Sequence, residues 1–521
     1  MHPVHSDPAR TLLRGGLVAD GIAEVTQRAD VLVDGPVIAG VITRGERPAD
    51  CAVIDLAPGS VICPGFIDAH VHAEGPLLAA GRVDGALAQG VTTLVVGQDG
   101  QSWIGATAAT ARYLNEYFAP VNGTLEPARD LSVAAFRDAV SGRLAQNIAI
   151  LASQGTIRHN VAGLARGPLD PGQRAAARRA VEDALADGAA GLSSGLDYLP
   201  SRFGDVPETA EIAAPLAAAG RPYVSHLRAY GAGVRDGLAE LTAVGTRAGI
   251  RVHASHLWGT PADIQAAFES AAGAGVALSY DMYPYRRSST VLAMLLLPPE
   301  LQAGGPDRTL AALADPRQRA ALLAGEKFTD EYLQDLYLGT LPPSYAQFAG
   351  QSVTQAAAGR AASAGEWALD LLAAARLRVG AHLDRRLLAD DHLAWLAEQD
   401  RQCAGSDGIY QGQHPHPRGY GAFARLAAHY LAQGRDSGYQ QVARHLAANA
   451  ADAYGLRDRG RIAPGLAADL CVIGPAGLAE RASYAAPQLV AAGIGLVMVN
   501  GVVAWRDGQP VAGRWPGTVV S

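Results

Sequence analysis

Between residues 61 and 408, short apolar runs alternate with alanine-rich stretches of helical character. This alternation is typical of parallel βαβ construction. The candidate strands cover residues 61–70, 92–99, 147–153, 191–196, 222–227, 251–257, 277–285 and 402–408. Because eight strands close a (β/α)8 barrel of the TIM type, the sequence predicts an α/β protein built on such a barrel.

The two ends of the chain have a different pattern, with short strand runs separated by Gly, Asp and Pro turns. We expect residues 1–62 and 458–521 to form one small β-sandwich, and residues 63–457 to form the barrel. The interval 286–401, between the seventh and eighth strands, is much longer than a crossover of roughly a dozen residues. It predicts an inserted, helical, lid-like segment at the barrel mouth.

Composition excludes several classes of protein. A net charge of −7 with dispersed basic residues gives no positive stripe for nucleic-acid binding. No apolar stretch reaches about 18 residues, so no membrane span is expected. The first residues, MHPVHSDPARTLLRGG, lack the apolar core of a secretory signal, so the cytoplasm is the expected compartment. The cysteines, which never pair as CxxC, are expected to be reduced: Cys51, Cys63, Cys403 and Cys471. A small-molecule substrate is expected, with the oligomeric state left open.

Polar side chains gather where the candidate strands end, which is where barrels of this type hold their active sites. Strand alternation points both histidines of an HxH pair toward the same face. The set comprises His70 and His72 after the first strand, Asp99 after the second, His226 after the fifth, His256 after the sixth and Asp407 after the eighth. Four imidazoles and two carboxylates match the ligand chemistry of zinc, so we predict one or two divalent ions, Zn²⁺ above all.

Several motifs resemble the amidohydrolase superfamily and, within it, the N-acyl-D-amino-acid deacylases (D-aminoacylases). They are PGFIDAHVH, SHLRAYG, the SH of ASHL, DMYPY followed by SST, GSDG, HPHPRGYGAF and RGRIAPGLAADL, and the likeness spans nearly the whole chain. The resemblance implies a barrel flanked by a β-sandwich made from both termini, and hydrolysis of an N-acyl amide.

Carried over residue by residue, the resemblance implies that His226 and His256 hold the tightly bound metal. His70 and His72 match a second site, and Asp407 corresponds to the catalytic acid/base. Where well-known members of the family have a cysteine in a GNCG turn, this sequence reads GQDG, with Asp99. An oxygen ligand is harder than a thiolate, which leaves the metal preference open.

Other members of the superfamily bridge two ions with a carboxylated lysine. The only lysine here, Lys327, lies in the long insertion and away from every strand end. Asp99 is therefore the candidate bridge if two ions bind.

The resulting hypothesis is that a metal-bound hydroxide attacks the amide carbonyl. Asp407 would take the proton of the water and hand it to the leaving nitrogen.

An N-acyl amino acid carries a carboxylate, which arginine forks and hydroxyl groups can bind. The candidate substrate-binding residues are Tyr198, Arg228, Tyr230, Trp258, Tyr283, Arg286, Arg287, Ser289 and Arg418, of which Arg418 and Tyr198 match positions that the family uses near the substrate. D-aminoacylases carry SHHK after strand six, whereas this chain has Trp258 in place of the carboxylate-binding lysine. Either an arginine such as Arg228 or Arg286 substitutes, or an aromatic part of the substrate packs on the tryptophan.

Other readings stay open at this point. The same barrel and metal could serve a cyclic-amide hydrolase of the dihydroorotase or hydantoinase kind, or a deaminase. The segment from Gly191 to Gly195 fits the GxSxG pattern of serine hydrolases, with Ser193 as nucleophile, although that reading leaves the metal-type cluster unexplained. A non-catalytic barrel predicts missing ligands, yet all six positions are filled.

Overall fold

The predicted barrel is present in the computed structural model, which describes residues 10–43, 48, 50–386 and 388–521. Its parallel strands are hydrogen-bonded in chain order: β6 (Phe66–Asp68), β8 (Val91–Val96), β9 (Asn147–Ser153), β10 (Gly191–Gly195), β11 (Tyr223–His226), β12 (Val252–Ala254), β13 (Leu278–Met282) and β17 (Gln402–Ala404). The ring closes where the Ala69 amide donates to the Ala404 carbonyl at 3.0 Å. The predicted fold class is confirmed.

The predicted first and last strands are each interrupted. Gly65 separates β5 (Val61–Pro64) from β6, and a Cβ at this position would lie 2.2 Å from the hydroxyl of Thr92. Only glycine fits so close a neighbouring strand. Beyond the ring, β7 (Val71–His72) pairs in parallel with β18 (Gly408–Ile409). These short strands extend the barrel edge that carries the histidines.

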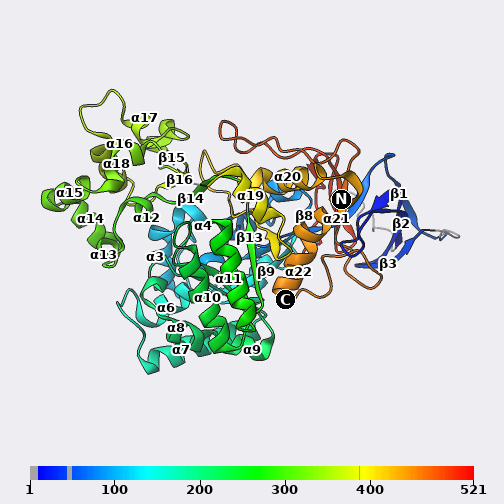
Figure 1. Cartoon of the computed structure of the whole chain (residues 1–521), viewed down its shortest axis with the longest axis horizontal. Coiled ribbons are helices and arrows are strands. Elements are labelled where there is room, and N and C mark those ends of the chain that lie inside the picture. Colours follow the sequence, from blue (N-terminus) through cyan, green and yellow to red (C-terminus); the bar gives the residue numbers. More distant parts are fainter. Residues whose placement is uncertain (1–9, 44–47, 49, 387) are drawn as a thin grey trace.

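Amphipathic helices cover the outside of the barrel (Figure 1). They include α7 (Pro171–Ala186), α8 (Val206–Ala213), α10 (Val234–Ala248), α11 (Pro261–Gly273), α19 (Asp390–Ala397) and α20 (Arg418–Leu431). At the start of α11, the Thr260 side chain accepts from the Asp263 amide and Pro261 takes the first helical position. In the described ranges, no helix combines the length and the apolarity needed to cross a membrane.

Strands from both ends of the chain are hydrogen-bonded into a single sheet, where the sequence predicted a β-sandwich made from both termini. Its members are β1 (Arg10–Val18), β2 (Gln27–Asp34), β3 (Val37–Ile42), β4 (Ala52–Asp55), β5, β19 (Leu470–Ile473), β20 (Ile494–Val499), β21 (Val502–Arg506) and β22 (Gln509–Pro510). Antiparallel pairing of β5 with β19 joins the two halves. Buried residues of both halves share an apolar cluster that includes Leu13, Val31, Ile62, Leu470 and Leu496. The domain boundaries at residues 62 and 458 stay a prediction.

The end of the chain also reaches the barrel itself. Strand β23 (Val519–Val520) pairs in parallel with β9, next to Ile148 and Ala149. One strand from the C-terminal segment therefore lies against the barrel.

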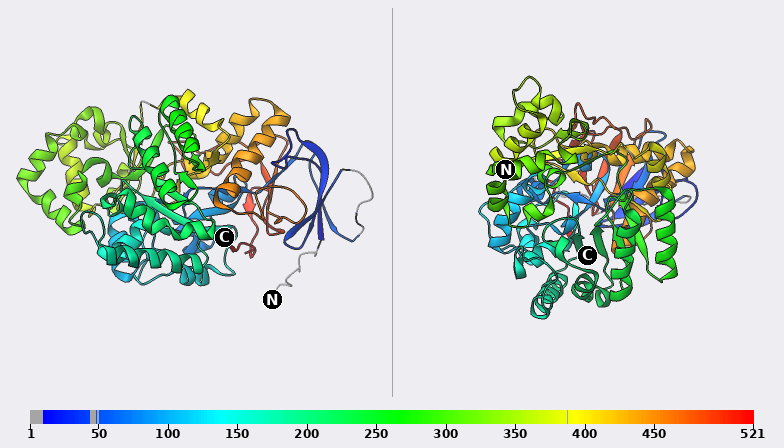
Figure 2. Two further views of the ribbon diagram at one scale, coloured as in Figure 1. Left: turned by 60° about the horizontal axis from the view of Figure 1, so that its bottom comes forward. Right: turned by 60° about the vertical axis from the view of Figure 1, so that its left-hand side comes forward.

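The insertion between β13 and β17 contains the predicted helices and a small sheet that the sequence did not predict. The helices are α12 (Leu292–Leu296), α13 (Pro299–Gln302), α14 (Pro306–Ala314), α15 (Pro316–Leu323), α16 (Asp330–Leu333), α17 (Val353–Ala357) and α18 (Ala364–Ala374). Antiparallel strands run in the order β14 (Arg287–Val291), β16 (Gly380–Asp384) and β15 (Leu336–Leu338). Figures 1 and 2 show the insertion at one end of the molecule and β1 to β3 at the other.

One buried histidine gives the fold a testable pH dependence. His445, in the π-helical turn Arg444–Ala448, is 2% exposed, stacks on Tyr430 with ring centroids 4.8 Å apart, and lies 3.0 Å from the amide oxygen of Gln441. Burial lowers its pKa to about 4. The imidazole is therefore neutral in the folded protein near pH 5, whereas in the unfolded chain it is protonated.

We expect this histidine to destabilise the fold as the pH falls from about 6.5 toward 4, because only the unfolded chain gains the proton in that window. Between pH 7 and pH 5, the free energy of unfolding should fall by about 2 kcal/mol more in the wild type than in His445→Gln, because the variant has no imidazole to protonate at this position. Urea unfolding at the two pH values measures the difference, and equal losses in both proteins would contradict the assignment.

Candidate metal centre and active site

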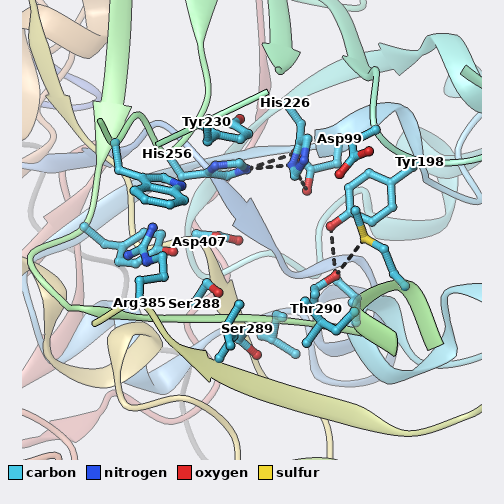
Figure 3. Close-up of a pocket in the computed structure, with 18 of the residues that line it drawn as sticks. Asp99, Tyr198, His226, Tyr230, His256, Ser288, Ser289, Thr290, Arg385 and Asp407 are labelled. Carbon is cyan, nitrogen blue, oxygen red and sulfur yellow. Dashed lines mark hydrogen bonds and ion pairs between the residues drawn. The ribbon is translucent and has the colours of Figure 1, made fainter. Parts of the chain in front are cut away.

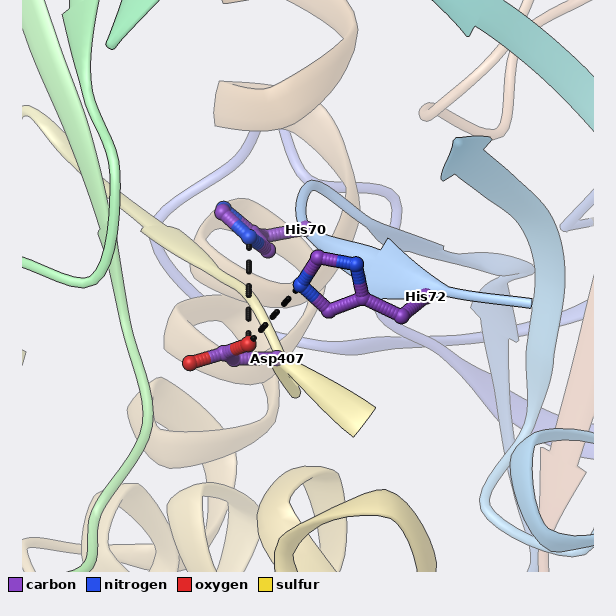
Figure 4. A group of neighbouring side chains, drawn as sticks. All are labelled: His70, His72 and Asp407. Carbon is purple, nitrogen blue, oxygen red and sulfur yellow. Dashed lines mark ion pairs between the residues drawn. The ribbon is translucent and has the colours of Figure 1, made fainter. Parts of the chain in front are cut away.

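The six predicted metal-ligand residues converge at the carboxyl ends of the barrel strands. His70 and His72 follow β6, Asp99 follows β8, His226 ends β11, His256 follows β12, and Asp407 lies between β17 and β18. Each is buried except His226, which is half-buried. Figure 4 shows His70, His72 and Asp407 facing one another across the mouth of the barrel.

Asp99 approaches both pairs of histidines, and Figure 3 shows it beside His226. Its Oδ1 is 3.5 Å from Nε2 of His70 and 3.7 Å from Nε2 of His256. Its Oδ2 is 3.5 Å from Nε2 of His72 and 3.9 Å from Nδ1 of His226. Nδ1 of His226 and Nε2 of His256 are 3.0 Å apart. One carboxylate thus contacts all four imidazoles.

The residues fit a divalent cation. Nε2 of His70 and Oδ1 of Asp99 are buried without a hydrogen-bond partner, which costs free energy unless another group satisfies them. Ligand atoms within 4.8 Å of one another form two overlapping trios: His70, His72 and Asp407, and His70, Asp99 and His256. Imidazole nitrogens and carboxylate oxygens are ligands that zinc uses in proteins.

Protonation in the cluster is strongly perturbed. Burial lowers the pKa of His72, but its bonds to Asp407 and Asp99 outweigh burial and raise that pKa to about 10. Burial and the adjacent His256 lower the pKa of His226 to about 3. Burial raises the pKa of Asp99, but the imidazoles, His70 first, bring it well below its ordinary value. His226 and Asp99 are therefore already in the protonation states that bind metals, and a cation would displace the proton held on His72.

Asp407 is held as a carboxylate by an arginine. Burial raises its pKa, but the guanidinium of Arg418 and the bond to His72 bring the pKa below the ordinary value. Nη1 of Arg418 lies 2.7 Å from Oδ2 of Asp407, while Oδ1 is 3.4 Å from Nε2 of His72 and 3.8 Å from Nε2 of His70. One oxygen thus faces the histidines and the other is ion-paired.

Three of the cluster residues have a backbone conformation that side chains rarely adopt. The φ angles are 56° at Asp99, 35° at His256 and 48° at Asp407. Such residues persist where the surroundings fix them, and they concentrate at functional sites. The amide of His256 donates to Asp281 at 2.8 Å, and the amide of Asp407 donates to the carbonyl of His70 at 2.7 Å.

Ser193 supports the turn that carries Asp99. Its hydroxyl donates to the carbonyl of Gly97 and accepts from the amide of Gly100 at 3.0 Å. A Cβ at Gly195 would lie 2.3 Å from the carbonyl oxygen of Asp99, so this turn packs directly on β10. The described residues place no histidine on the Ser193 hydroxyl, and the GxSxG segment therefore serves the metal-type cluster and does not form a serine triad.

Asp281 is a supporting residue that the sequence did not single out. This buried carboxylate, in the middle of β13, accepts from the His256 amide, lies 3.0 Å from Nε2 of His253 and lies 3.5 Å from Nδ1 of His70. Burial raises its pKa, but His70 and His253 bring it below the ordinary value. A carboxylate on the far nitrogen of a ligating histidine fixes the tautomer and the orientation of the ring.

Asp68 joins the ends of the first and last strands. It accepts from the Ser406 amide at 2.8 Å, from the Ser406 hydroxyl at 2.5 Å and from the His70 amide at 3.3 Å. Burial raises its pKa to about 7, although these bonds act in the opposite direction. This residue fixes the segment with His70 against the segment with Asp407.

A cavity of about 360 Å³ leads to the cluster. The barrel supplies one side, including His72, Asp99, Tyr198, His226, Tyr230, His256, Trp258, Tyr283 and Asp407. The insertion supplies the other, including Ser288, Ser289, Thr290, Met294, Leu295, Tyr332, Leu383 and Arg385. The lining is mainly apolar with a few polar groups, as in most small-molecule sites.

The predicted substrate-binding residues divide into two groups. Tyr198, Tyr230, Trp258, Tyr283 and Ser289 line the cavity. Arg418 lies behind it, against Asp407. Arg228 is outside the lining, where its guanidinium binds Glu240 and the carbonyls of Leu196, Arg202 and Gly204. Arg286 is also outside, paired with Asp384 at 2.7 Å. Acceptors within the chain already occupy both of these arginines, so a role for them in substrate binding stays a prediction that the geometry does not favour.

Two of the described arginines line the cavity, Arg385 and Arg386, and the sequence indicated neither. Arg385 follows β16, and its guanidinium carbon lies 4.9 Å from the ring centroid of Trp258. No local pattern distinguishes it from its neighbour Arg386. Only the contact between the insertion and the segment after β12 places it at the site.

Comparisons with known proteins agree with this geometry. A family described as "Amidohydrolase family" matches residues 329–505. An N-acyl-D-glutamate deacylase of Alcaligenes xylosoxydans xylosoxydans is 29% identical over 96% of this chain and 94% of the relative. A D-aminoacylase of the same organism is 29% identical over 99% and 98%. The crystal structure of an N-acyl-D-glutamate deacylase from Bordetella bronchiseptica, complexed with zinc and a phosphonate inhibitor, has a TM-score of 0.81 and 26% identity over 98% of this chain and 99% of its own.

The barrel, its buried cluster of metal-type ligands and these comparisons together support a metal-dependent amidohydrolase, a class of enzymes that hydrolyse carbon–nitrogen bonds. Within that superfamily, the chain is similar over its whole length to the N-acyl-D-amino-acid deacylases. The resemblance that the motifs indicated is confirmed.

Replacing Asp281 with Asn should weaken metal binding by about 10- to 100-fold, because the charge that orients His70 and His256 is lost. Competition with a chromogenic chelator measures the metal affinity. Asp183→Asn, at an exposed position of α7, is the control. An unchanged affinity in the Asp281 variant would show that this carboxylate plays no part in the metal centre.

Ser193→Ala should retain turnover within about tenfold of the wild type, since only one hydrogen-bonding hydroxyl beneath the Asp99 turn is lost. Steady-state rates at saturating metal, together with the metal content, measure this. Complete loss of turnover at full metal occupancy would instead favour Ser193 as a nucleophile.

Proposed function

We propose that the chain is a zinc-dependent N-acyl-D-amino-acid deacylase, which cleaves the amide between an acyl group and the nitrogen of a free D-amino acid. The observation that carries the proposal is the placement of Asp407, with one oxygen toward the histidines and the other on Arg418, at the edge of a mainly apolar cavity. The names of the full-length relatives supply the class of substrate.

In this proposal His226 and His256 would hold one ion, and His70 and His72 would contribute to a second position. Asp99 is the candidate bridge, since each of its oxygens is within 3.9 Å of imidazoles from both pairs. The set of nitrogen and oxygen donors is the reason for naming zinc. When bound, the metal lowers the pKa of water and polarises the substrate carbonyl.

Asp407 is the proposed general base and acid. As a carboxylate it takes a proton from the attacking water while the new carbon–oxygen bond forms. It then gives that proton to the nitrogen as the carbon–nitrogen bond breaks, because an amide anion is a poor leaving group. Arg418, which pairs with Oδ2, keeps the carboxylate ionised before attack and leaves Oδ1 free to face the reacting water.

A metal and substrate screen tests the proposal. We expect the zinc-loaded protein to hydrolyse N-acyl-D-amino acids, to lose this activity after dialysis against a chelator, and to regain it when zinc is added. The panel should also contain N-acyl-L-amino acids, hydantoins and aminated bases. Preference for a hydantoin or an aminated base, or activity that resists complete metal removal, would overturn the proposed function.

Asp407→Asn should lower turnover by about 10²- to 10⁴-fold, since the amide cannot accept the proton of the water. Metal analysis of the same preparation should still find zinc, because four histidines and Asp99 remain. The exposed Asp183→Asn variant should keep wild-type rates. If Asp407→Asn were fully active with its metal bound, the acid/base role would fall to another residue.

A further inference from the structure

The cavity and the residues around it carry several arginines, and they differ in whether an acidic side chain neutralises them. Arg386 pairs with Asp335 at 2.6 Å, Arg418 pairs with Asp407, and Arg286 and Arg287 both approach Asp384. Arg385 forms no ion pair with any described residue. It is also nearly buried, with 8% of its surface exposed.

The guanidinium of Arg385 is held in place by neutral groups. Its Nε donates to the carbonyl of Arg286 at 2.7 Å, and its Nη2 donates to the carbonyl of Tyr285 at 2.8 Å. The same group lies over the rings of Trp258, at 4.9 Å, and Tyr283, at 5.4 Å. Nη1 has no hydrogen-bond acceptor among the described residues. The guanidinium is therefore held in a fixed orientation, and its Nη1 can still donate a hydrogen bond to a ligand.

Aromatic rings connect this cation to the metal-type cluster. The ring of Trp258 stacks on Tyr230 with centroids 6.4 Å apart, and Tyr230 lies 5.3 Å from the ring of His256. Figure 3 shows Arg385 below Asp407, at the same end of the cavity. A ligand that reached from the cluster along Tyr230 and Trp258 would place its far end at Arg385.

A buried cation without a counter-charge is costly, and an anionic ligand removes much of that cost. Burial lowers the pKa of Arg385 and outweighs the opposite effect of Tyr283 and Asp407. A guanidinium remains protonated even so, and its planar fork matches a carboxylate.

We propose that Arg385 binds the carboxylate of the substrate and makes this chain selective for N-acyl amino acids over uncharged N-acyl amides. The inference rests on the proposed function, because it takes the bound anion to be the free carboxylate of the amino acid. It assigns the specificity-determining charge to the insertion, on a wall of the cavity opposite the barrel strands.

A purely structural role is the competing outcome. The two backbone bonds and the ring contacts could simply fasten the turn after β16 to the segment after β13 and to the barrel mouth. A structural role predicts equal damage to every substrate, whereas an anion-binding role predicts damage only to substrates that carry the charge.

The test compares the best N-acetyl-D-amino acid of the panel with the primary amide of the same compound. We expect wild-type kcat/KM to favour the acid by about 100-fold, the range of a charged hydrogen bond. Arg385→Gln should lose most of this preference through a higher KM for the acid, with kcat/KM for the amide unchanged. Arg385→Lys should keep part of the preference. Arg378→Gln, at an exposed position before β16, should match the wild type.

Two results would overturn the inference. In the first, Arg385→Gln and Arg385→Lys lose kcat/KM equally for the acid and for the amide; in the second, both variants keep the wild-type preference for the acid. Metal content and thermal unfolding of each variant establish that it has folded. If the wild type hydrolyses neither compound, the proposed function fails and a calorimetric titration of the metal-loaded protein decides separately on Arg385. Tighter binding of the acid than of the amide, lost in Arg385→Gln, supports the inference, and equal affinities contradict it.

Discussion

Four imidazoles and two carboxylates meet at one end of the barrel, buried from water, and the rest of the site depends on how their charges are balanced. Asp99 contacts all four imidazoles, and Arg418 neutralises the outer oxygen of Asp407. Burial alone would drive these groups toward their neutral forms. A divalent ion held here would balance these charges and satisfy Nε2 of His70 and Oδ1 of Asp99, which are buried without a hydrogen-bond partner.

Much of the barrel could be predicted from the sequence, because a buried parallel strand leaves a short apolar run in the sequence. The run 147–153 coincides with β9. The first strand was predicted as continuous over 61–70, but Gly65 divides it because Thr92 leaves no space for a side chain. The sheet of the insertion was not predicted, since a strand as short and polar as β14 (Arg287–Val291) lacks both the apolar alternation and the length that identify a strand.

The six cluster residues could be predicted because each stands at or just beyond the end of a strand. Asp281 could not be identified from the sequence, because it lies within β13 and its role depends on contacts with His70 and His256, which come from other strands. Arg385 could not be identified from the sequence for a related reason. It is one of many arginines, and the cavity lining alone separates it from Arg228 and Arg286, whose side chains are occupied elsewhere.

The pairing of β5 with β19 brings together segments from opposite ends of the chain. While the ribosome is still translating the barrel, β5 has no such neighbour, and one edge of β1 to β5 stays open. Unpaired strand edges invite association with other chains. Because residues 470–473 are synthesised after the whole barrel, the edge of β5 stays unpaired until late in synthesis, and the terminal sheet is completed only once the barrel strands have been made.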